Sequence, residues 1–567
     1  MSATRRIQRR ESAQPTGEWP SLWPPLLQRI HAARGSQDAG AAMPRLADLL
    51  PPDGMHGLQA AVTLLQDAIT RDARILVVGD FDCDGATACA VGVRGLRMLG
   101  ARQVLHAVPN RMVHGYGLTP GLVEELAALQ PDLVVTVDHG IACHAGIAAA
   151  KARGWQVLVT DHHLPGDTLP AADAIVDPNQ TGDAFPCKAL AGVGVMFYVL
   201  LALRARLGVQ ADLTSLLDLV AVGTVADMVP LDANNRALVG AGMRRLRAGQ
   251  GCAGLRALIE AAKRREAVLT TADIGYAVGP RINAAGRLED MGIGIECLLT
   301  DDPARARELA AVLQAINEER RGVQQQMTDD AEAALAQLSG SEAAACLFDP
   351  DWHPGVVGLV ASKLKERLHR PAIAFAPAEP GSATLRGSAR SIPGFHIRDA
   401  LALVDARHPG LIPRFGGHAM AAGLSLQADD LPTFRQAFTR VANDWLTEEL
   451  LTDTLQSDGA LQPDEFSIVT ALALRDGGHW GQGYPEPLFD GEFEVLGFKR
   501  VGETHLKLEL GIGSKRLNAI HFGGWEGAPP QGRVRIAYRL TPDDYRGGDA
   551  IQLVVVHREA ATPSPPA

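Results

Sequence analysis

The chain contains little cysteine and no long apolar run. Seven cysteines occur among 567 residues, without a C-x-x-C spacing; this argues against a disulfide framework and for a reducing compartment. The longest apolar run, 189–203, has 15 residues. It is too short to span a bilayer and predicts a buried helix. The basic start has no apolar segment behind it, so we expect no secretory signal. Together these features predict a cytoplasmic protein with no membrane association.

Positive charge is also in deficit. The net charge is −11, which by itself argues against a polyanionic partner. A site that chelates divalent metals must, however, carry surplus carboxylates when it is counted without them. The basic residues also cluster locally, at 263–265, 320–321, 499–500 and 515–516. Any nucleic-acid surface would therefore be a groove rather than a whole face, and composition leaves such a partner open.

The segment from about 74 to 177 alternates short β-branched runs with alanine- and leucine-rich stretches. Strands alternating with helices predict a parallel α/β sheet covered on both faces, with ligands outside the carboxyl ends of the strands. The predicted strands are Ile75–Val78, 104–108, Leu133–Val137, 157–160 and 175–176.

The remaining sequence predicts three further parts. A segment rich in Ala, Glu, Gln and Arg predicts a long helix over Pro303–Gln337. A second α/β unit follows, with strands at 344–348 and 372–375 around a helix at 356–368. Beyond a polar crossing at 453–465, period-two patterns indicate a small β-barrel of the OB type.

The predicted fold is therefore α/β with a small β-barrel at its end. The expected parts are an N-terminal extension (1–44), a parallel-sheet domain (45–300), a connecting helix (301–340), a second α/β domain (341–450), the barrel (451–560) and a disordered tail (561–567).

The stretch RILVVGDFDCDGAT, at 74–87, carries three aspartates at alternate positions directly after a predicted strand. An EF-hand loop also begins D-x-D-x-D-G, but its twelfth position needs a bidentate Glu and here holds Val91. Three anions this close repel one another in a folded site unless cations hold them. A solvated acidic turn and a D-x-D-x-T/V phosphatase are the alternatives.

Other carboxylates and imidazoles end neighbouring segments. Asp138-His139-Gly140 follows one strand, and Asp161-His162-His163 follows another. Asp227 ends the apolar run 220–226, which we group with these strands. Each group alone has an ordinary reading as a turn former or a core histidine, but their convergence on one edge with Asp80, Asp82 and Asp84 indicates a shared site.

The donor types suggest the ligand. Many carboxylates with one or two imidazoles and no thiolate suit Mn²⁺ or Mg²⁺. More than one ion is expected, since the donors exceed what a single ion needs. Two adjacent ions could stabilise both the attacking and the leaving oxygen of a phosphoryl displacement.

In this order, the D-x-D-x-D-G, D-H-G and D-H-H motifs resemble the DHH phosphoesterase superfamily. Six further stretches resemble its single-strand-specific exonucleases, and the likeness runs from about residue 45 to about 560. They are PNR…GYG at 109–117, VADMVP at 225–230, GPRINAAGRL at 279–288, HPGVVGLVASK at 353–363, RGSARS at 386–391 and GGHAMAAG at 416–423. The resemblance implies a DHH domain, a DHHA1 domain and an OB-fold.

The resemblance also implies roles for the carboxylates and histidines. Asp138 would bridge two ions, Asp80 would bind the first ion or orient its water, and His163 would contact the scissile phosphate or support the ligands. Asp161 is either an anchor of its turn or a support for the ligands, and His139 receives no ligand role. The remaining implied ligands are Asp82, Asp84, His162 and Asp227.

For substrate, the resemblance implies a 5′→3′ exonuclease that acts on single-stranded DNA in repair and recombination and releases 5′-mononucleotides. Arg111, Ser388 and Arg390 would form a 5′-phosphate pocket across two domains. The turn at Gly416, Gly417 and His418 either approaches the ligand or is purely structural. Candidate contacts to the DNA backbone are Arg281, Asn283 and Arg287.

Single-strand-binding protein and a RecQ-type helicase are partners that the resemblance implies, and a monomer is expected. Two alternatives stay open. One is a DHH phosphodiesterase for short oligonucleotides or cyclic dinucleotides, although such relatives are usually shorter. The other is a non-catalytic scaffold that grips single strands, although such relatives lose ligands that are present here.

Overall fold

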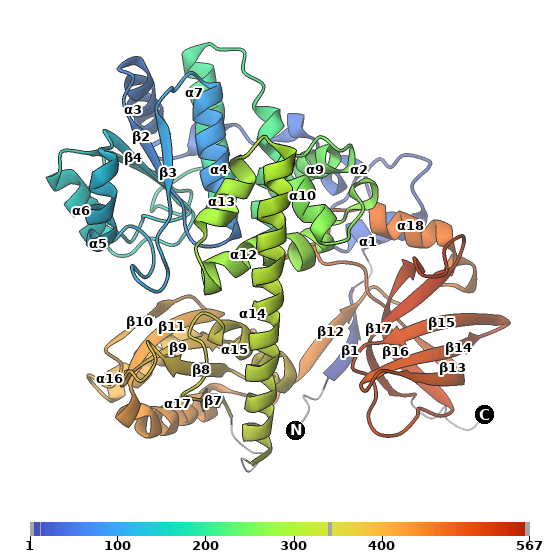
Figure 1. The fold of residues 1–567 in the computed structure, drawn as a ribbon. Helices are drawn as coiled ribbons and strands as arrows, with labels where there is room; N and C mark the ends of the chain where they lie inside the picture. The colour runs from blue at the N-terminus through green and yellow to red at the C-terminus, as the bar shows by residue number, and fades with distance from the viewer. Residues whose placement is uncertain (1–4, 12, 338–342, 562–567) are drawn as a thin grey trace.

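A computed structural model describes residues 5–11, 13–337 and 343–561 (Figure 1). The predicted tail from 562 onward and the end of the predicted connecting helix, 338–340, lie outside the described residues. The described chain forms an upper α/β domain, a lower α/β domain joined to it by one long helix, and a β-barrel beside both (Figure 1).

The upper domain is built on a parallel five-stranded sheet in the order β3-β2-β4-β5-β6. Its strands are β2 (Ile75–Val78), β3 (Val104–Ala107), β4 (Leu133–Val137), β5 (Gln156–Thr160) and β6 (Ala174–Val176). Side chains alternate between two apolar layers: Ile75 and Val77 belong to one core, and Leu76 and Val78 to the other. The predicted parallel sheet, buried on both faces, is confirmed.

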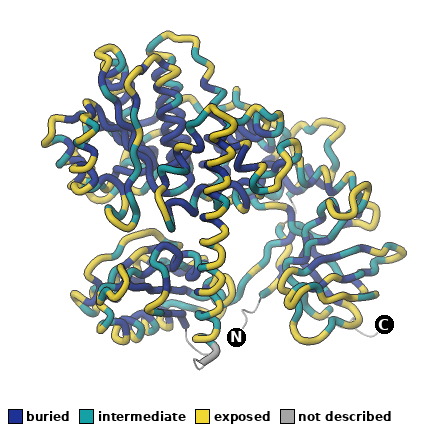
Figure 2. The backbone as a smooth tube through the Cα atoms, viewed as in Figure 1, coloured by how far each residue is buried: buried dark blue, intermediate teal, exposed yellow. Residues whose placement is uncertain are grey.

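Helices cover both faces of this sheet. One core includes residues of α3 (Leu58–Thr70), α4 (Cys83–Met98) and α7 (Gly192–Leu207), and the other includes residues of α5 (Pro120–Leu126) and α6 (His144–Ala152). Figure 2 shows this region as the most continuously buried part of the backbone. The apolar run at 189–203 lies largely within α7, as the sequence predicts.

A helical layer follows the sheet and leads to the long helix. Its helices are α8 (Leu217–Ala226), α9 (Ala233–Arg247), α10 (Ala253–Ala261), α11 (Thr271–Asp273), a π-helical turn (Ile274–Val278), α12 (Gly279–Leu288) and α13 (Gly292–Leu299). The grouping of 220–226 with the strands is wrong, because this run is the buried helix α8. The long helix α14 spans Pro303–Gln337, as predicted.

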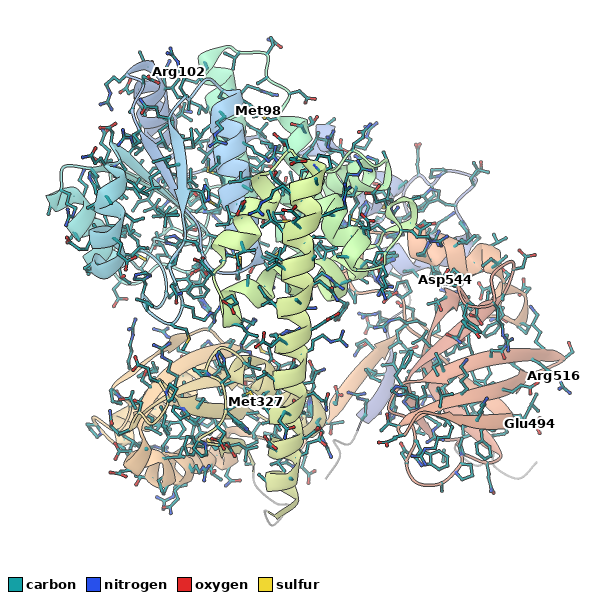
Figure 3. All side chains as sticks on the ribbon, viewed as in Figure 1. Met98, Arg102, Met327, Glu494, Arg516 and Asp544 are labelled. Carbon is teal, nitrogen blue, oxygen red and sulfur yellow. The ribbon has the colours of Figure 1, made fainter. Side chains whose placement is uncertain are left out.

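The lower domain has a mixed sheet in the order β10-β11-β9-β8-β7. One face packs against α16 and α17, while α14 and α15 pack at the β7–β8 end of the other face, where Met327 of α14 is buried (Figure 3). The elements are β7 (Ala345–Phe348), α15 (Val357–Leu368), β8 (Ala372–Pro377), β9 (Thr384–Arg390), α16 (Ile397–Arg407), β10 (Arg414–Gly417), β11 (Ala421–Gln427) and α17 (Leu431–Trp445).

The last part is a closed five-stranded barrel in the order β13-β14-β15-β17-β16. This is the small barrel that the period-two segments predict. Helix α18 (Ile468–Asp476) precedes it. The strands are β13 (Phe489–Val501), β14 (His505–Ile512), β15 (Lys515–His521), β16 (Arg533–Pro542) and β17 (Ile551–Ala560).

The N-terminal segment joins the barrel to the rest of the molecule. Strand β1 (Arg5–Arg9) pairs in parallel with β12 (Asp453–Ser457), so the predicted polar crossing at 453–465 contains a strand. Arg9 makes two hydrogen bonds to the buried carboxylate of Asp490 in β13, at 2.9 and 3.0 Å. Helices α1 (Pro25–Ala32) and α2 (Ala39–Ala42) follow. No described helix is both long and apolar enough to cross a membrane.

Candidate metal centre and phosphate pocket

The carboxyl ends of neighbouring parallel strands bring the predicted acidic residues to one edge of the upper sheet. Val78 of β2 is in register with Thr136 of β4, and Val137 with Thr160 of β5. Asp80, Asp138 and the D-H-H run therefore leave the sheet side by side. Asp80 and Asp138 are 3% and 2% exposed, so their carboxylates meet largely out of water.

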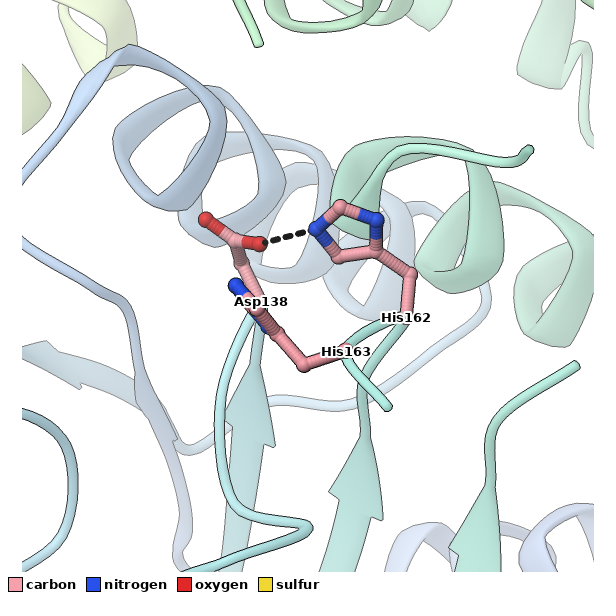
Figure 4. Close-up of side chains that lie close together, drawn as sticks. All are labelled: Asp138, His162 and His163. Carbon is pink, nitrogen blue, oxygen red and sulfur yellow. Dashed lines mark ion pairs between the residues drawn. The ribbon is translucent and has the colours of Figure 1, made fainter. Parts of the chain in front are cut away.

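Three overlapping groups of donor atoms form at this edge, each with its atoms within 4.8 Å of one another. Asp138 and His162 each belong to two groups, and Figure 4 shows these two side chains facing each other. The sharing of Asp138 is what two adjacent cations with a bridging carboxylate require, whereas the imidazole of His162 can serve only one of them. The groups are Asp80, Asp82 and Asp138; Asp138, His162 and His163; and Asp84, His162 and Asp227.

Several donor atoms are buried without a hydrogen-bond partner in the described part of the chain. These are Oδ1 of Asp80, Oδ1 of Asp138 and Nε2 of His162. The His162 nitrogen lies 3.1 Å from Oδ1 of Asp138 and 3.6 Å from Oδ2 of Asp227. Unsatisfied buried polar atoms are unfavourable, and cations bound at these overlapping groups would satisfy all three. The donor set therefore fits divalent cations that prefer oxygen and imidazole ligands.

The pKa values of the aspartates also indicate a cation site. Burial, followed by the charge of Asp82, raises the pKa of Asp80 to about 8. Burial and the neighbouring carboxylates also raise the pKa values of Asp84 and Asp138. Without cations the cluster thus resists full ionisation, and cations would reverse that tendency.

Backbone geometry fixes two of these aspartates. Asp84 accepts hydrogen bonds from the backbone N–H groups of Gly192 and Val193 at 2.6 and 3.0 Å, at the start of α7. Asp138 has φ of 63°, in the left-handed region that few non-glycine residues adopt. A Cβ atom on Gly192 would lie 2.5 Å from the Asp138 Cβ. Glycine at 192 is therefore what allows α7 to approach Asp138.

Asp161 organises the D-H-H turn. It accepts hydrogen bonds from the backbone N–H groups of Ile141 and His162 and from Nδ1 of His163, the last at 2.7 Å. Burial favours the neutral acid, yet the histidine contacts and these hydrogen bonds hold the pKa of Asp161 below its usual range. Burial likewise opposes the charged form of His163, but Asp161 raises the pKa of His163 to about 9. His163 is therefore a cation at neutral pH in this arrangement.

Beside this edge lies a cluster of three arginines from both α/β domains, Arg111, Arg287 and Arg390. Burial, followed by the charges of Arg111 and Arg390, lowers the pKa of Arg287 to about 9. Arg390 donates to Oγ of Ser388 at 2.9 Å. In the described chain none of the three has a carboxylate within 4.0 Å. Positive charges gathered with no carboxylate in direct contact predict an anion site.

The structure brings together Arg111, Ser388 and Arg390, and it adds Arg287 to them. It places Arg281 elsewhere, bonded to Gln314 of α14 and to the Ala277 carbonyl. The side-chain oxygen of Asn283 accepts the backbone N–H of Cys83 at 2.8 Å, so it caps α4 beside the aspartates.

The turn after β10 reaches the same region. The ring of His418 lies 6.3 Å from that of His163, with 20° between the ring planes. Gly417 has φ of 142°, and a Cβ at Gly416 would meet no atom within 4 Å. The lower domain thus presents an imidazole and open backbone to the upper one.

Tyr116 and Gly192 are site residues for which the sequence indicates no role. The Tyr116 hydroxyl lies 3.4 Å from Nε2 of His163 and 3.3 Å from the Asp138 carbonyl. The GYG stretch that contains Tyr116 is the one signal available, and nothing near Gly192 in the sequence marks it.

Comparison with known proteins places this fold in a class. Three family models match the chain: the DHH family N-terminal domain over residues 74–224, the DHHA1 domain over 340–444 and the RecJ OB domain over 457–557. The parallel sheet with its acidic edge is thus a DHH domain, followed by DHHA1 and OB domains.

Full-length relatives define the family within that class. The chain is 46% identical over 566 residues to the single-stranded-DNA-specific exonuclease RecJ of Escherichia coli, covering 96% of this chain and 98% of that protein. It is 36% identical over 524 residues to RecJ of Thermus thermophilus, covering 90% and 73%. A crystal structure of RecJ from Thermus thermophilus with Mn²⁺ matches 99% of this chain and 80% of the solved chain at a TM-score of 0.81 and 32% identity. The chain belongs to the RecJ family.

Proposed function

We propose that the protein is a single-stranded-DNA-specific 5′→3′ exonuclease that releases 5′-mononucleotides with the help of two divalent cations, in DNA repair and recombination. The observation that carries this proposal is the position of the arginine cluster beside the carboxylate–histidine edge. A metal-dependent phosphodiesterase needs only the edge, whereas an enzyme that starts at a phosphorylated terminus also needs an anion site a short way from it.

The cation site is assigned to the members of the three overlapping groups other than His163. Asp80 and Asp82 would hold one cation, Asp84 and Asp227 the other, with Asp138 between them and His162 beside the second. Bound Mn²⁺ or Mg²⁺ would supply Lewis acidity and an activated water for phosphodiester hydrolysis. The fixed backbone around Asp84 and Asp138 keeps these donors in place before substrate arrives.

His163 is assigned to the phosphate. Its Nδ1–H is held by Asp161, so its Nε2–H edge faces away from the turn, toward the Tyr116 hydroxyl. A charged imidazole there would bind a non-bridging phosphoryl oxygen and stabilise the negative charge that develops during displacement.

The 5′-phosphate pocket is assigned to Arg111, Ser388, Arg390 and Arg287. A terminal phosphate dianion would satisfy guanidinium groups that have no carboxylate partner. Because Arg111 and Arg287 come from the upper domain and Arg390 from the lower domain, the pocket needs both domains. A terminus anchored there sets the direction of digestion.

The barrel is assigned to binding the rest of the single-stranded DNA. Lys507 of β14 pairs in register with Lys499 of β13, and its Nζ lies 5.8 Å from the ring of Tyr545, which is 94% exposed. Phe522, which directly follows β15, is 63% exposed. Exposed aromatic rings with lysines are typical of single-strand tracks on OB-folds.

The cellular setting is proposed on family grounds. We expect a cytoplasmic location. Functional contact with single-strand-binding protein and a RecQ-type helicase would supply single-stranded DNA to this site. Co-purification of the protein with either partner in defined mixtures would test these contacts.

The direct test of activity is digestion of one oligonucleotide carrying the label at its 5′ or its 3′ end. With Mn²⁺ or Mg²⁺, the 5′ label should appear at once as a mononucleotide, and the 3′ label should pass through a ladder of shortened chains. Chelator should stop both, and a duplex should resist. Release of the 3′ label first, or of internal fragments, would contradict the proposal.

A further inference from the structure

The face of the lower sheet that carries Ser388 and Arg390 continues beyond the phosphate pocket. Along β9, Leu385 and Ala389 point into the apolar core, so Arg386, Ser388 and Arg390 share the opposite face. On β10, Phe415 packs against the same core, which leaves Arg414 and Gly416 on the Ser388 side. We call this surface the open face.

Strand register arranges the open face in rows. Ser388 is paired with Gly423, which is paired with Gly416. In the next row, Arg386 is paired with Ser425, which is paired with Arg414. Neighbouring strands lie about 4.8 Å apart, and successive rows on one face about 7 Å apart. The row of Arg386 and Arg414 is thus one step from Ser388 and two steps from Arg390.

This second row lies on the side away from the metal centre. His418, which faces His163, bonds through its backbone N–H to the Ala421 carbonyl, and Ala421 is paired with Arg390. Arg386 therefore lies farther from the scissile position than Arg390 and Ser388 do. It lies beyond the pocket proposed for the terminal phosphate.

The second row offers charge and room. In the described chain neither Arg386 nor Arg414 has a carboxylate within 4.0 Å. The charge of Arg386 contributes to lowering the pKa of Arg111, after burial, so it lies near the pocket. The neighbouring Ser388 row has a glycine floor: a Cβ on Gly416 would meet nothing within 4 Å, and one on Gly423 only the Gly387 carbonyl at 4.0 Å.

We propose that Arg386, Arg414 and Ser425 form a polyphosphate subsite, which binds the β- and γ-phosphates of a 5′-triphosphorylated strand whose α-phosphate occupies the Ser388–Arg390 pocket. The subsite extends the proposed exonuclease function and rests on it. A row of guanidinium groups and a hydroxyl beside an open glycine floor suits an extended chain of phosphates.

The chemistry at the scissile bond is unchanged. Water adds to the first internal phosphorus and the bond to the 3′-oxygen breaks; the proton lost by the water is balanced by the one that the 3′-oxygen gains. The products are a nucleoside 5′-triphosphate and a chain one residue shorter with a 5′-phosphate. A triphosphate terminus therefore needs no separate removal before digestion begins.

The test compares one oligonucleotide with a hydroxyl, a monophosphate or a triphosphate at its 5′ end. Wild-type protein should degrade the triphosphate form and release labelled nucleoside triphosphate first. R386A/R414A should lose about tenfold or more in kcat/KM on the triphosphate form and less than about threefold on the monophosphate form. The matched control is Arg440→Ala, an exposed position on α17, which packs on the other face of the sheet.

A second measurement does not depend on catalysis. Inorganic tripolyphosphate, added in chelator, should raise the thermal midpoint of wild-type protein and of R440A but not that of R386A/R414A. This arm also shows whether a free polyphosphate binds as well as a strand end.

Three outcomes would overturn the subsite: no wild-type cleavage of the triphosphate form while the monophosphate form is cleaved, equal losses on all three ends, or an unchanged tripolyphosphate response in the variant. Equal losses would instead indicate a contact to the DNA backbone. Failure of the wild type on the monophosphate form is a different result and would count against the exonuclease proposal itself.

Discussion

Nδ1 of His163 lies 2.7 Å from Oδ1 of Asp161, and the same carboxylate also receives backbone N–H groups of the D-H-H turn. One buried acid therefore sets both the shape of the turn and the charge of the imidazole that we assign to the phosphate. The sequence leaves the role of Asp161 between a turn anchor and a support for the ligands; its contacts are to the backbone of the turn and to the His163 ring.

Asp161→Asn should lower kcat by about 10- to 100-fold, because the amide cannot hold His163 as a cation. His163→Gln should cause a loss at least as large. If the two residues act as a unit, the double variant should be no worse than H163Q. Steady-state rates with Mn²⁺ measure this, and losses that multiply in the double variant would contradict it.

Gly192→Ala should displace Asp138 without removing any proposed ligand. The added methyl would lie 2.7 Å from Oδ1 of Asp138, and a shift of a ligand by a fraction of an ångström should lower kcat at least about tenfold. Unfolding stability should fall by about 1–3 kcal/mol. Gly322→Ala in α14 is the matched control, because a Cβ there meets nothing within 4 Å and alanine favours a helix. Full activity in G192A would show that the contact does not position Asp138.

Arg390→Ala should weaken the preference for a phosphorylated end. Charge-assisted hydrogen bonds contribute about 1.5–3 kcal/mol each, so kcat/KM on 5′-phosphorylated strands should fall by about 10- to 100-fold. The rate on 5′-hydroxyl strands should change much less. Competition between the two strands in one reaction measures the ratio directly, with R440A alongside. An equal loss on both ends would argue against the pocket.

Acid should destabilise the packing of α1 against the segment 477–484, which precedes the barrel. Burial lowers the pKa of His31 to about 4, and its ring nitrogens contact Tyr484 and the Gly477 carbonyl at 2.6 and 2.8 Å. The pKa of His31 in the folded protein lies below its unfolded value of about 6.5. The stability that neutral His31 contributes is therefore fully present above pH about 6.5. It is lost as the pH falls from about 6.5 toward about 4.

His31→Gln should therefore reduce the acid sensitivity. The contribution of His31 to the free energy of unfolding should differ by about 1 kcal/mol between pH about 7.5 and about 5.5. Urea titrations at the two pH values measure this, with the exposed His56→Gln as control. An identical pH dependence in H31Q and wild type would contradict it.

Local sequence patterns predict the individual strands and helices. The β-branched runs, the long helix and the period-two barrel strands are confirmed, and the strand ends at Asp80, Asp138 and Asp161 indicate the shared edge. Asp227 reaches that edge from helix α8, because a short run of Val, Ala and Gly does not by itself distinguish a buried strand from a buried helix.

Contacts between distant segments are what the sequence does not reveal. The pairing of β1 with β12 joins segments from opposite ends of the chain, Arg5 with Asp453 for example, and nothing local to either strand specifies its partner. Arg281 and Arg287 are both candidate DNA contacts in the sequence, and which of them joins the arginine cluster depends on which side of α12 faces the lower domain. That choice is made by tertiary packing, which also determines that only glycine fits at 192.

The most direct test of the central claim is Mn²⁺ binding by calorimetry, followed by anomalous diffraction from crystals grown with Mn²⁺. We expect two ions per chain at the edge that holds Asp80, Asp138 and Asp227. Binding should be weaker in Asp138→Asn, whose amide side chain still tolerates the left-handed backbone. Wild-type protein that binds no Mn²⁺, or binds it away from this edge, would contradict a metal centre at the end of this sheet.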